Sequence, residues 1–312
     1  MTITLKIPAA RQAATRAKLA AAGFSFSTPD HTFWQGRTEG VVISFYRSGK
    51  VVLQGKASDA WADELGGTVH KRATPGEKKP RVPRERSGEP FGDALALLPE
   101  PAPESWIGID EAGKGDYFGP LVVAAARVER DQLGWLAELG VADSKALTDK
   151  RAKALAPLLE EALPIEQVIL LPPKYNELYG EIGNLNVMLG WAHAAAAEKV
   201  LERADAELIL SDQFSKSNHV KRQLKTIGRT KRFTQRTKAE SDPAVAAASV
   251  VARATFLRCL ERLGRDAGFT LPKGASSPVL QAAKRWVRER GPDSLVSVAK
   301  LHFRTTEKAK RG

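Results

Sequence analysis

The sequence predicts an α/β (α+β) protein in which a small antiparallel sheet domain precedes a mixed central sheet flanked by helices. Closely spaced β-rich segments fill the first 70 residues, whereas strands alternate with longer helical segments after residue 103. The length agrees with this division, since 312 residues suffice for about two domains, each with its own core.

The amino-terminal segment begins with an alternating strand, ITLKI, and an alanine-rich helix that Pro8 opens and Gly23 ends. TFWQGRT, GVVISFYR and KVVLQGK then suit an antiparallel meander, which a helix over 57–65 closes. Helices should cover one face of this sheet. On the other face we expect Trp34, Tyr46, Arg47, Lys50, Gln54 and Lys56. Tyr46, Arg47 and Lys50 are the candidate nucleic-acid contacts among them.

Charge and composition separate the two predicted domains. Residues 70–90 contain four prolines, two glycines and seven basic residues, which leaves little to pack. We therefore predict domains at 1–69 and 103–312, joined by a basic Pro/Gly-rich linker at 70–102. The whole chain has a formal charge of +12, so a polyanionic partner is expected, with nucleic acid first.

The cysteine content limits the metal chemistry that is available. A single cysteine, Cys259, excludes an internal disulfide and a cysteine-based zinc site, so any metal must use oxygen or imidazole ligands. The amino terminus lacks the apolar core of a signal peptide, and no apolar run approaches the roughly 18 residues of a membrane span. We expect a cytoplasmic protein that has no membrane partner.

Acidic residues follow two apolar strands of the predicted sheet. Asp110 and Glu111 stand where WIGID meets a glycine-rich turn, and Asp212 ends ELILSD. Strand ends are where α/β folds place catalytic groups, so these carboxylates can converge at one edge of the sheet. Adjacent residues on an extended chain point to opposite faces, unless the strand end bends. The alternative is that each acid is an ordinary cap or turn residue.

A further acidic position precedes the long apolar helix that starts near residue 243. Either Glu240 or Asp242 can supply a fourth carboxylate, and Asp242 fits the helix cap better because Pro243 follows it. A carboxylate cluster without cysteine ligands suits Mg²⁺ or Mn²⁺, and two such ions about 4 Å apart support phosphodiester cleavage. His193 lies in an alanine-rich helix and is assigned no role.

A compact loop of Gly113, Lys114 and Gly115 follows the first two carboxylates. Its small side chains allow backbone N–H groups to approach a phosphate or a ribose. The alternative is a solvated turn. No GxxxxGK[ST] pattern is present, which argues against a nucleotidase with a phosphate-binding loop.

Seven segments form an ordered series along the chain: DEAGKGDYFGPLVVAA at 110–125, DSKALTDKR at 143–151, KYNELYGEIGNLNVMLGWAH at 174–193, SDQF at 211–214, TKAESDPAVAAASVVAR at 237–253, LPKGAS at 271–276 and AKLHFRTT at 299–306. In this order they resemble bacterial ribonuclease HIII, a type 2 ribonuclease H. The amino-terminal segment is similar to the small domain of that family in the order of its elements.

The resemblance implies a ribonuclease H-like catalytic domain and a substrate-binding domain with a fold similar to TATA-binding protein. It implies hydrolysis of the RNA strand of RNA/DNA hybrids with two divalent ions, giving 5′-phosphate and 3′-hydroxyl ends. By motif position, the catalytic and metal-binding residues are Asp110, Glu111, Asp212 and Glu240. Gly113, Lys114 and Gly115 match the loop whose backbone meets the ribose 2′-hydroxyl. Ser144 and Lys145 match a segment that contacts phosphate.

Two alternatives stay open at this point. One is an activity like that of ribonuclease HII, which cuts at single ribonucleotides in duplex DNA. The other is a non-catalytic protein that binds hybrids and uses its acids as caps and turn residues. In each case the expected partner is nucleic acid, and we expect a monomer without an obligate protein partner.

Overall fold

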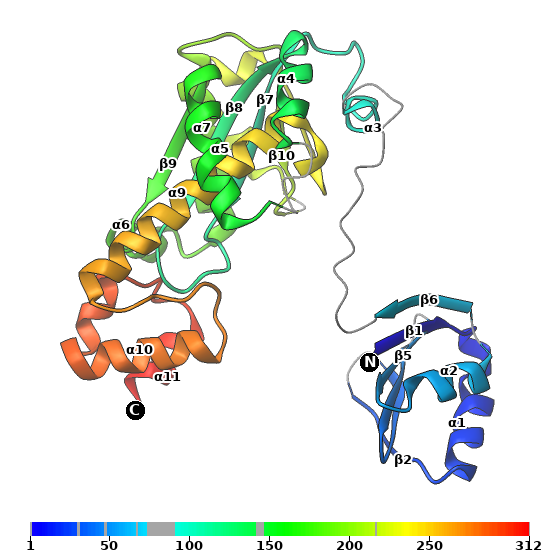
Figure 1. Ribbon diagram of the computed structural model, residues 1–312. Coiled ribbons are helices and arrows are strands. Elements are labelled where there is room, and N and C mark those ends of the chain that lie inside the picture. Colours follow the sequence, from blue (N-terminus) through cyan, green and yellow to red (C-terminus); the bar gives the residue numbers. More distant parts are fainter. Residues whose placement is uncertain are drawn as a thin grey trace. The chain divides into compact units, whose positions relative to one another are not determined.

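The computed structural model describes residues 2–29, 32–46, 49–66, 68–73, 91–141, 147–215 and 217–311. The chain divides into two compact units, a first unit of residues 1–85 and a second unit of residues 86–312 (Figure 1). Each unit buries its own set of apolar side chains, so each has a core of its own.

An antiparallel sheet forms the first unit, with the strand order β2-β3-β4-β5-β1-β6. Its strands are β1 (Thr2–Lys6), β2 (Ser25–Ser27), β3 (Thr32–Thr38), β4 (Val41–Tyr46), β5 (Lys50–Gly55) and β6 (Thr68–Ala73). Helices α1 (Gln12–Ala21) and α2 (Ser58–Leu65) contribute to the same apolar cluster as the strands. The predicted antiparallel sheet domain is therefore confirmed.

The face of this sheet that points away from α1 and α2 carries exposed polar side chains. Lys6 and Lys50 are paired across β1 and β5 and are both exposed, as is Gln54. The expectation for Trp34 is wrong, because it is only 2% exposed and its indole N–H donates to Oε1 of Gln12 at 3.0 Å. Alternation along β3 places Trp34 on the side of α1, where a large ring adds to the core.

The predicted linker is partly structured. Residues 70–73 belong to β6, which pairs with β1 at the edge of the first sheet. Backbone hydrogen bonds to a neighbouring strand do not depend on apolar side chains, which explains why composition alone missed this edge strand. At the other end, Phe91, Ala94 and Leu98 are buried in the core of the second unit. Residues 74–90 lie outside the described residues.

A mixed sheet organises the second unit, with the strand order β11-β10-β7-β8-β9. Its strands are β7 (Ser105–Ala112), β8 (Leu121–Glu129), β9 (Ile165–Leu170), β10 (Leu208–Asp212) and β11 (Arg232–Arg236). β10 runs parallel to β7 and β11, whereas β8 runs antiparallel to β7 and β9. The predicted mixed sheet is confirmed. β11 was not predicted, because RFTQR shows no alternation of apolar residues.

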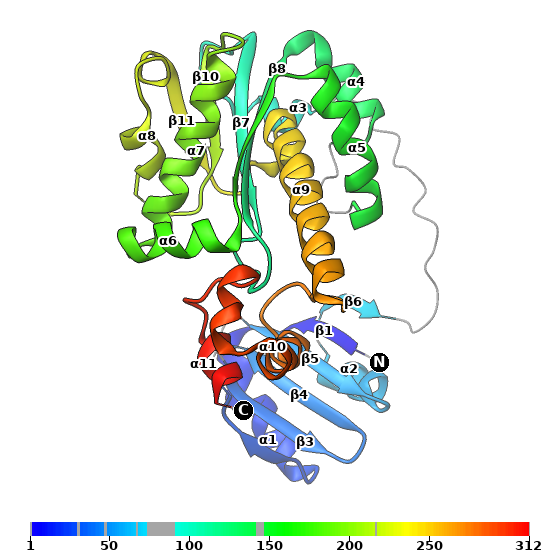
Figure 2. The ribbon, with the colours of Figure 1, turned by 90° about the vertical axis from the view of Figure 1, so that its left-hand side faces the viewer.

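Helices cover both faces of this sheet, with α7 on one side and α9 and α5 on the other (Figure 2). The helices of the second unit are α3 (Gly92–Leu95), α4 (Leu133–Glu138), α5 (Asp149–Ala162), α6 (Pro172–Ile182), α7 (Leu185–Leu201), α8 (His219–Gln223), α9 (Pro243–Ala267), α10 (Ser277–Arg290) and α11 (Arg304–Lys310). Gly108 lets α9 approach β7 closely, since a Cβ there would lie 2.1 Å from the backbone nitrogen of Val245.

The long helix α9 forms the centre of the second unit. Among the described residues it alone is long and apolar enough to cross a membrane, which the sequence did not lead us to expect. Of its most apolar 18-residue stretch, 78% is buried inside the protein. Its apolar character is therefore accounted for by packing against β7, β8 and α5.

Candidate active site

Asp110 and Asp212 lie next to each other on adjacent parallel strands. Ser211 of β10 is paired with Ile109 of β7, so the next residue on each strand is one of these two acids. Both side chains point to the face that α9 covers. Asp110 accepts a hydrogen bond from the Ser249 hydroxyl of α9, and Oδ1 of Asp212 accepts one from the backbone N–H of Ala239 at 3.0 Å.

Glu111 points to the opposite face of the sheet, toward α7. Its Oε2 lies 3.2 Å from Nε2 of His193, and Nδ1 of His193 lies 3.1 Å from Oγ of Ser211. His193 is fully buried, and its ring packs edge-on against Phe214 with the centroids 4.9 Å apart. His193 therefore links Glu111 to β10. Sequence reasoning missed this residue, because nothing in an alanine-rich helix signals which strand residue it will face.

Burial and crowding change the acidity of these carboxyls. Burial, followed by the negative charge of Glu111, raises the pKa of Asp110 well above its ordinary value. Burial also raises the pKa of Asp212, with further contributions from the charges of Glu111 and Glu240. Burial alone would raise the pKa of Glu111, but His193 and Lys114 outweigh it and hold that pKa below its ordinary value.

The structure separates the two candidates for the fourth carboxylate. Asp242 is fully buried, and its Oδ1 accepts hydrogen bonds from the N–H of Ala244 at 2.9 Å and from the indole of Trp106 at 3.0 Å. It caps α9 and ties that helix to β7. Glu240 lies just before α9, where its charge acts on Asp212. Of the two acids, Glu240 is therefore the one whose charge reaches the Asp212 carboxyl.

The donor chemistry of this cluster suits a hard divalent cation. The donors are carboxylate oxygens, and two of the carboxyls have pKa values that burial and neighbouring negative charge raise. A cation among them would offset that repulsion. In the part of the chain that the structure describes, no three His, Cys, Asp or Glu side chains are already arranged to hold an ion.

The glycine loop after β7 combines one crowded position with one open position. Gly113 has a φ of 89°, and a Cβ there would lie 2.2 Å from the carbonyl oxygen of Pro120, so only glycine fits. A Cβ at Gly115 would meet nothing within 4 Å. Lys114 places its Nζ 3.5 Å from Oε1 of Glu111, so the loop lies beside the carboxylates. Its backbone at Gly115 is open to a ligand.

Two segments from the end of the chain hold this loop in place. The buried Lys300 donates from Nζ to the carbonyl oxygens of Asp116 at 2.9 Å and Gly119 at 2.7 Å. The backbone N–H of Gly274 donates to Oδ1 of Asp116 at 2.6 Å. Burial lowers the pKa of Lys300 to about 7. The 271–276 and 299–306 segments therefore position the loop, a role that the sequence alone did not reveal.

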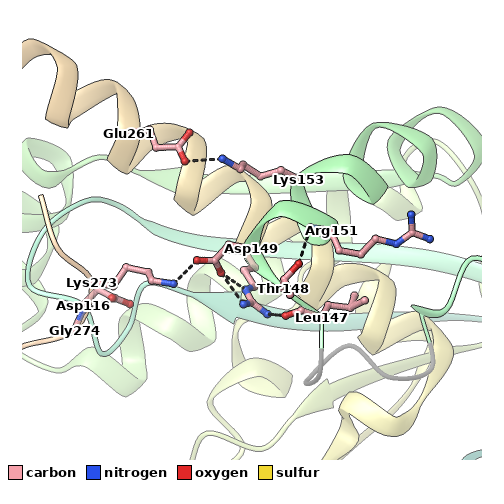
Figure 3. Close-up of polar contacts among 10 residues, drawn as sticks. Asp116, Leu147, Thr148, Asp149, Arg151, Lys153, Glu261, Lys273 and Gly274 are labelled. Carbon is pink, nitrogen blue, oxygen red and sulfur yellow. Dashed lines mark hydrogen bonds and ion pairs between the residues drawn. The ribbon is translucent and has the colours of Figure 1, made fainter. Parts of the chain in front are cut away.

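Asp149 connects three further motif segments (Figure 3). Its Oδ1 accepts hydrogen bonds from the Arg253 guanidinium of α9 at 2.6 and 3.1 Å, and Lys273 binds its other oxygen. Arg253 also donates to the carbonyl oxygen of Leu147 at 2.9 Å. Hydrogen bonding from Lys273, and then from Arg253, holds the pKa of Asp149 below its ordinary value. The predicted phosphate contacts, Ser144 and Lys145, lie outside the described residues.

The predicted contacts of the first unit belong to one hairpin. Tyr46 ends β4 and is half-buried, and Lys50 begins β5 and is exposed. The N–H of Gly49 donates to the carbonyl oxygen of Tyr46 at 3.0 Å within the turn between them. Arg47, the third predicted contact, lies outside the described residues.

Known proteins resemble both units of the chain. The family described as ribonuclease HII matches residues 107–306, and a family described only as a domain of unknown function matches residues 7–78. The ribonuclease HIII of Geobacillus kaustophilus is 42% identical, covering 86% of this chain and 85% of its own length. That of Protochlamydia amoebophila is 35% identical over 91% of this chain and 89% of its own length.

Solved structures agree with the sequence relatives. The crystal structure of Bst-RNase HIII in complex with Mn²⁺ has a TM-score of 0.64 and 34% identity, and covers 99% of this chain and 98% of that one. Aquifex aeolicus RNase H3 has a TM-score of 0.54 and 26% identity over 96% of this chain and 98% of that one. The likeness thus extends over both units and beyond the motif segments. The chain belongs to the ribonuclease HIII family, and it is a ribonuclease H, an endonuclease that hydrolyses phosphodiester bonds.

Proposed function

We propose that this protein cleaves the RNA strand of RNA/DNA hybrids with two divalent ions, Mg²⁺ or Mn²⁺, and leaves 5′-phosphate and 3′-hydroxyl ends. The ions would be held by Asp110, Glu111, Asp212 and Glu240. The observation that carries the proposal is the placement of Asp110 beside Asp212, near the carboxyl ends of the neighbouring strands β7 and β10. The Mn²⁺ complex of the relative Bst-RNase HIII supports the use of a divalent ion.

The four acids differ in the face of the sheet on which they lie and in their neighbouring side chains, and we assign them different roles. Asp110 and Asp212 share the face toward α9, which makes them the most direct oxygen ligands. Glu111 acts from the other face, where His193 restrains its carboxylate. Bound divalent ions would supply activation of the attacking water and stabilisation of the leaving oxygen. His193 is a positioning residue in this scheme, and no histidine needs to transfer a proton.

Recognition of RNA is assigned to the glycine loop. The open space above Gly115 would admit the ribose, whose 2′-hydroxyl distinguishes RNA from DNA. Backbone N–H groups of Gly113, Lys114 and Gly115 would supply hydrogen bonds there, while Ser144 and Lys145 would contact phosphate. Within the first unit, the exposed sheet face at Lys50 would hold the hybrid by its backbone.

A cleavage assay tests this proposal. A hybrid labelled on its RNA strand is incubated with the full chain and Mg²⁺, Mn²⁺ or a chelator, and the product ends are mapped. We expect cleavage within the RNA strand with either ion, none with the chelator, and 5′-phosphate ends. Cleavage that persists in chelator, or products with a 2′,3′-cyclic phosphate, would contradict the two-ion scheme, because the second result requires the 2′-hydroxyl as nucleophile.

Cleavage at single ribonucleotides in duplex DNA is a second candidate function. The match of residues 107–306 to the family described as ribonuclease HII favours it. The same assay with a duplex that contains one ribonucleotide separates the two, and we expect the continuous hybrid to be cut faster. Family membership among endonucleases leaves the non-catalytic alternative without support.

The proposal also covers the location and the oligomeric state of the enzyme. We propose a cytoplasmic monomer that needs no obligate protein partner, since each unit has its own apolar core. Sedimentation of the purified chain at micromolar concentration should give the mass of one chain, 33.8 kDa. A stable dimer would contradict this part of the proposal.

A further inference from the structure

The segment between Asp212 and Glu240 is strongly basic, and the scheme above gives its basic residues no role. Residues 213–239 contain nine Lys and Arg residues and no Asp or Glu. The segment includes α8 and β11, which lie together at the edge of the second sheet beside α7 (Figure 2). Three of these basic residues pair with acids from elsewhere in the chain, Lys231 with Asp205, Arg232 with Glu207 and Arg236 with Asp242. The remaining excess of basic residues gives the segment a positive charge that attracts polyanions.

A groove lies within this segment, with a volume of about 270 Å³. Its lining residues are Lys221, Arg222, Leu224, Gly228, Arg229, Lys231 and Phe233. Lys221 and Arg222 are exposed in the last turn of α8, and within the described residues neither forms an ion pair. Their charges are therefore available to a ligand.

The floor of the groove is held rigidly from behind. The buried carboxylate of Glu198 on α7 accepts hydrogen bonds from the backbone N–H of Lys225 at 2.5 Å and of Gly228 at 3.0 Å. Nε of Arg229 donates to the carbonyl oxygen of Leu224 at 2.6 Å, which restrains its guanidinium. Phe233 packs against the core beneath α7. Positive side chains on a fixed backbone lose less entropy when they bind an anion.

The groove lies along a strand that leads to the carboxylates. β11 is parallel to β10, with Arg236 opposite Asp212 and Arg232 opposite Leu208. Lys231 and Phe233 are three to five residues before Arg236, which is roughly 10–16 Å along a strand. On the scale of double-stranded DNA, which rises about 3.4 Å per base pair, this separation corresponds to about four base pairs.

We propose that this groove binds the phosphate backbone of the substrate duplex about four base pairs from the bond that is cut. The inference rests on the proposed function, and it adds a second contact to the one assigned to the first unit. Arg guanidinium groups bind phosphate oxygens in pairs, and Lys ammonium groups act as point charges. Contacts of this kind are independent of sequence and depend strongly on salt.

The first test measures hybrid binding by the full chain in chelator. The groove variant is K221Q/R222Q, and the matched control is K308Q/K310Q, which removes two exposed charges on α11 outside the groove. At about 0.1 M salt, we expect the groove variant to bind roughly ten-fold more weakly. The slope of the logarithm of the binding constant against the logarithm of the salt concentration should become shallower by about two. The control should stay within about two-fold of the unchanged protein. Thermal unfolding verifies that both variants fold.

The outcomes separate the groove from the proposed activity. Unchanged affinity and salt dependence in K221Q/R222Q would overturn the inference, as would an equal loss in K308Q/K310Q. Either result would direct attention to a different occupant, such as an acidic protein. If the unchanged protein binds the hybrid but does not cut it with Mg²⁺ or Mn²⁺, the proposed function fails while the binding result still decides the groove.

A second test locates the contact along the duplex. The probe is a DNA duplex in which a few ribonucleotides fix the position of the enzyme. Neutral methylphosphonate linkages replace phosphates about four base pairs from these ribonucleotides, on one side or the other. We expect these linkages to weaken binding by the unchanged protein and to have little further effect on K221Q/R222Q, because the lost partners are the same. Equal losses in both proteins would place the contact elsewhere.

Discussion

The two units of this protein differ in the polar groups that they bury. Among the described residues, the buried polar side chains of the first unit are hydroxyls, and Thr15, Thr32 and Ser58 donate to nearby carbonyl oxygens. The second unit buries ionisable groups, including His193, Asp242 and Lys300. Burial of a charge is costly unless it is paired, so such groups persist where hydrogen bonds or ligands hold them.

This difference agrees with the proposed roles of the two units, substrate binding for the first and catalysis for the second. The first unit has a sheet with an exposed polar face, which suits binding to a nucleic-acid backbone without chemistry. The second unit holds carboxylates with shifted pKa values near the carboxyl ends of β7 and β10, which suits chemistry on a bound substrate. Changes at the carboxylates of the second unit should therefore alter turnover, and changes in the first unit should alter affinity.

The largest expected effect is the loss of a strand-end carboxylate. Asp110→Asn or Asp212→Asn should lower kcat on an RNA/DNA hybrid by on the order of a thousand-fold or more, because each removes an anionic ligand from the ion site. Hybrid binding should change little, as measured by fluorescence anisotropy. As a structural contrast, Asp242→Ala should lower the free energy of unfolding by about 1–2 kcal/mol through loss of the α9 cap. Turnover near the unchanged level in either Asn variant would refute the assignment.

The buried Lys300 should make the stability of the protein depend on pH. Its pKa is lowered from 10.5 to about 7 in the folded protein, so between these values the unfolded chain holds a proton that the folded chain has released. Stability from this group therefore rises with pH across that window. Compared with Lys300→Met, the unchanged protein should gain on the order of a few kcal/mol in unfolding free energy from pH 7 to 10. Parallel pH profiles in urea titrations would contradict this expectation.

Removal of the first unit should affect affinity more than turnover. A chain without residues 1–85 should have a KM for hybrid that is roughly 10–100-fold higher, because the tethered sheet no longer raises the local concentration of substrate. Its kcat at saturating hybrid should stay close to that of the full chain. Lys50→Gln in the full chain should act in the same direction and more weakly. An unchanged KM after the deletion would break the proposed division of work.

The two loop glycines should respond differently to the same added methyl group. Gly113→Ala should lower both thermal stability and activity, since a Cβ meets Pro120 and the φ of 89° is strained for alanine. Gly115→Ala should leave the melting temperature nearly unchanged, because its surroundings are open. If the backbone there meets the ribose, Gly115→Ala should still slow hybrid cleavage by about ten-fold, or on the order of 1 kcal/mol. Full activity would remove Gly115 from the site.

Local patterns account for what could be predicted from the sequence. The strands that carry Asp110 and Asp212 are short apolar runs, and they were found because periodicity and turn residues act over a few positions, although β7 continues two residues beyond Asp110 to Ala112. The cap role of Asp242 followed from the proline after it. β11 and β6 could not be found in this way, because most of their side chains are polar and pairing with the neighbouring strand makes them extended.

By itself, the sequence determined the two-part architecture, the order of the main strands and helices, and the acids that are candidates for catalysis, with Glu240 and Asp242 both open as the fourth. These follow from short-range alternation, capping and motif order. Only the tertiary structure decided that His193 restrains Glu111, that Lys300 holds the glycine loop, and that Glu240 rather than Asp242 acts on Asp212. Such contacts join positions far apart in the chain, and their partners are chosen by how the strands and helices pack rather than by any local pattern.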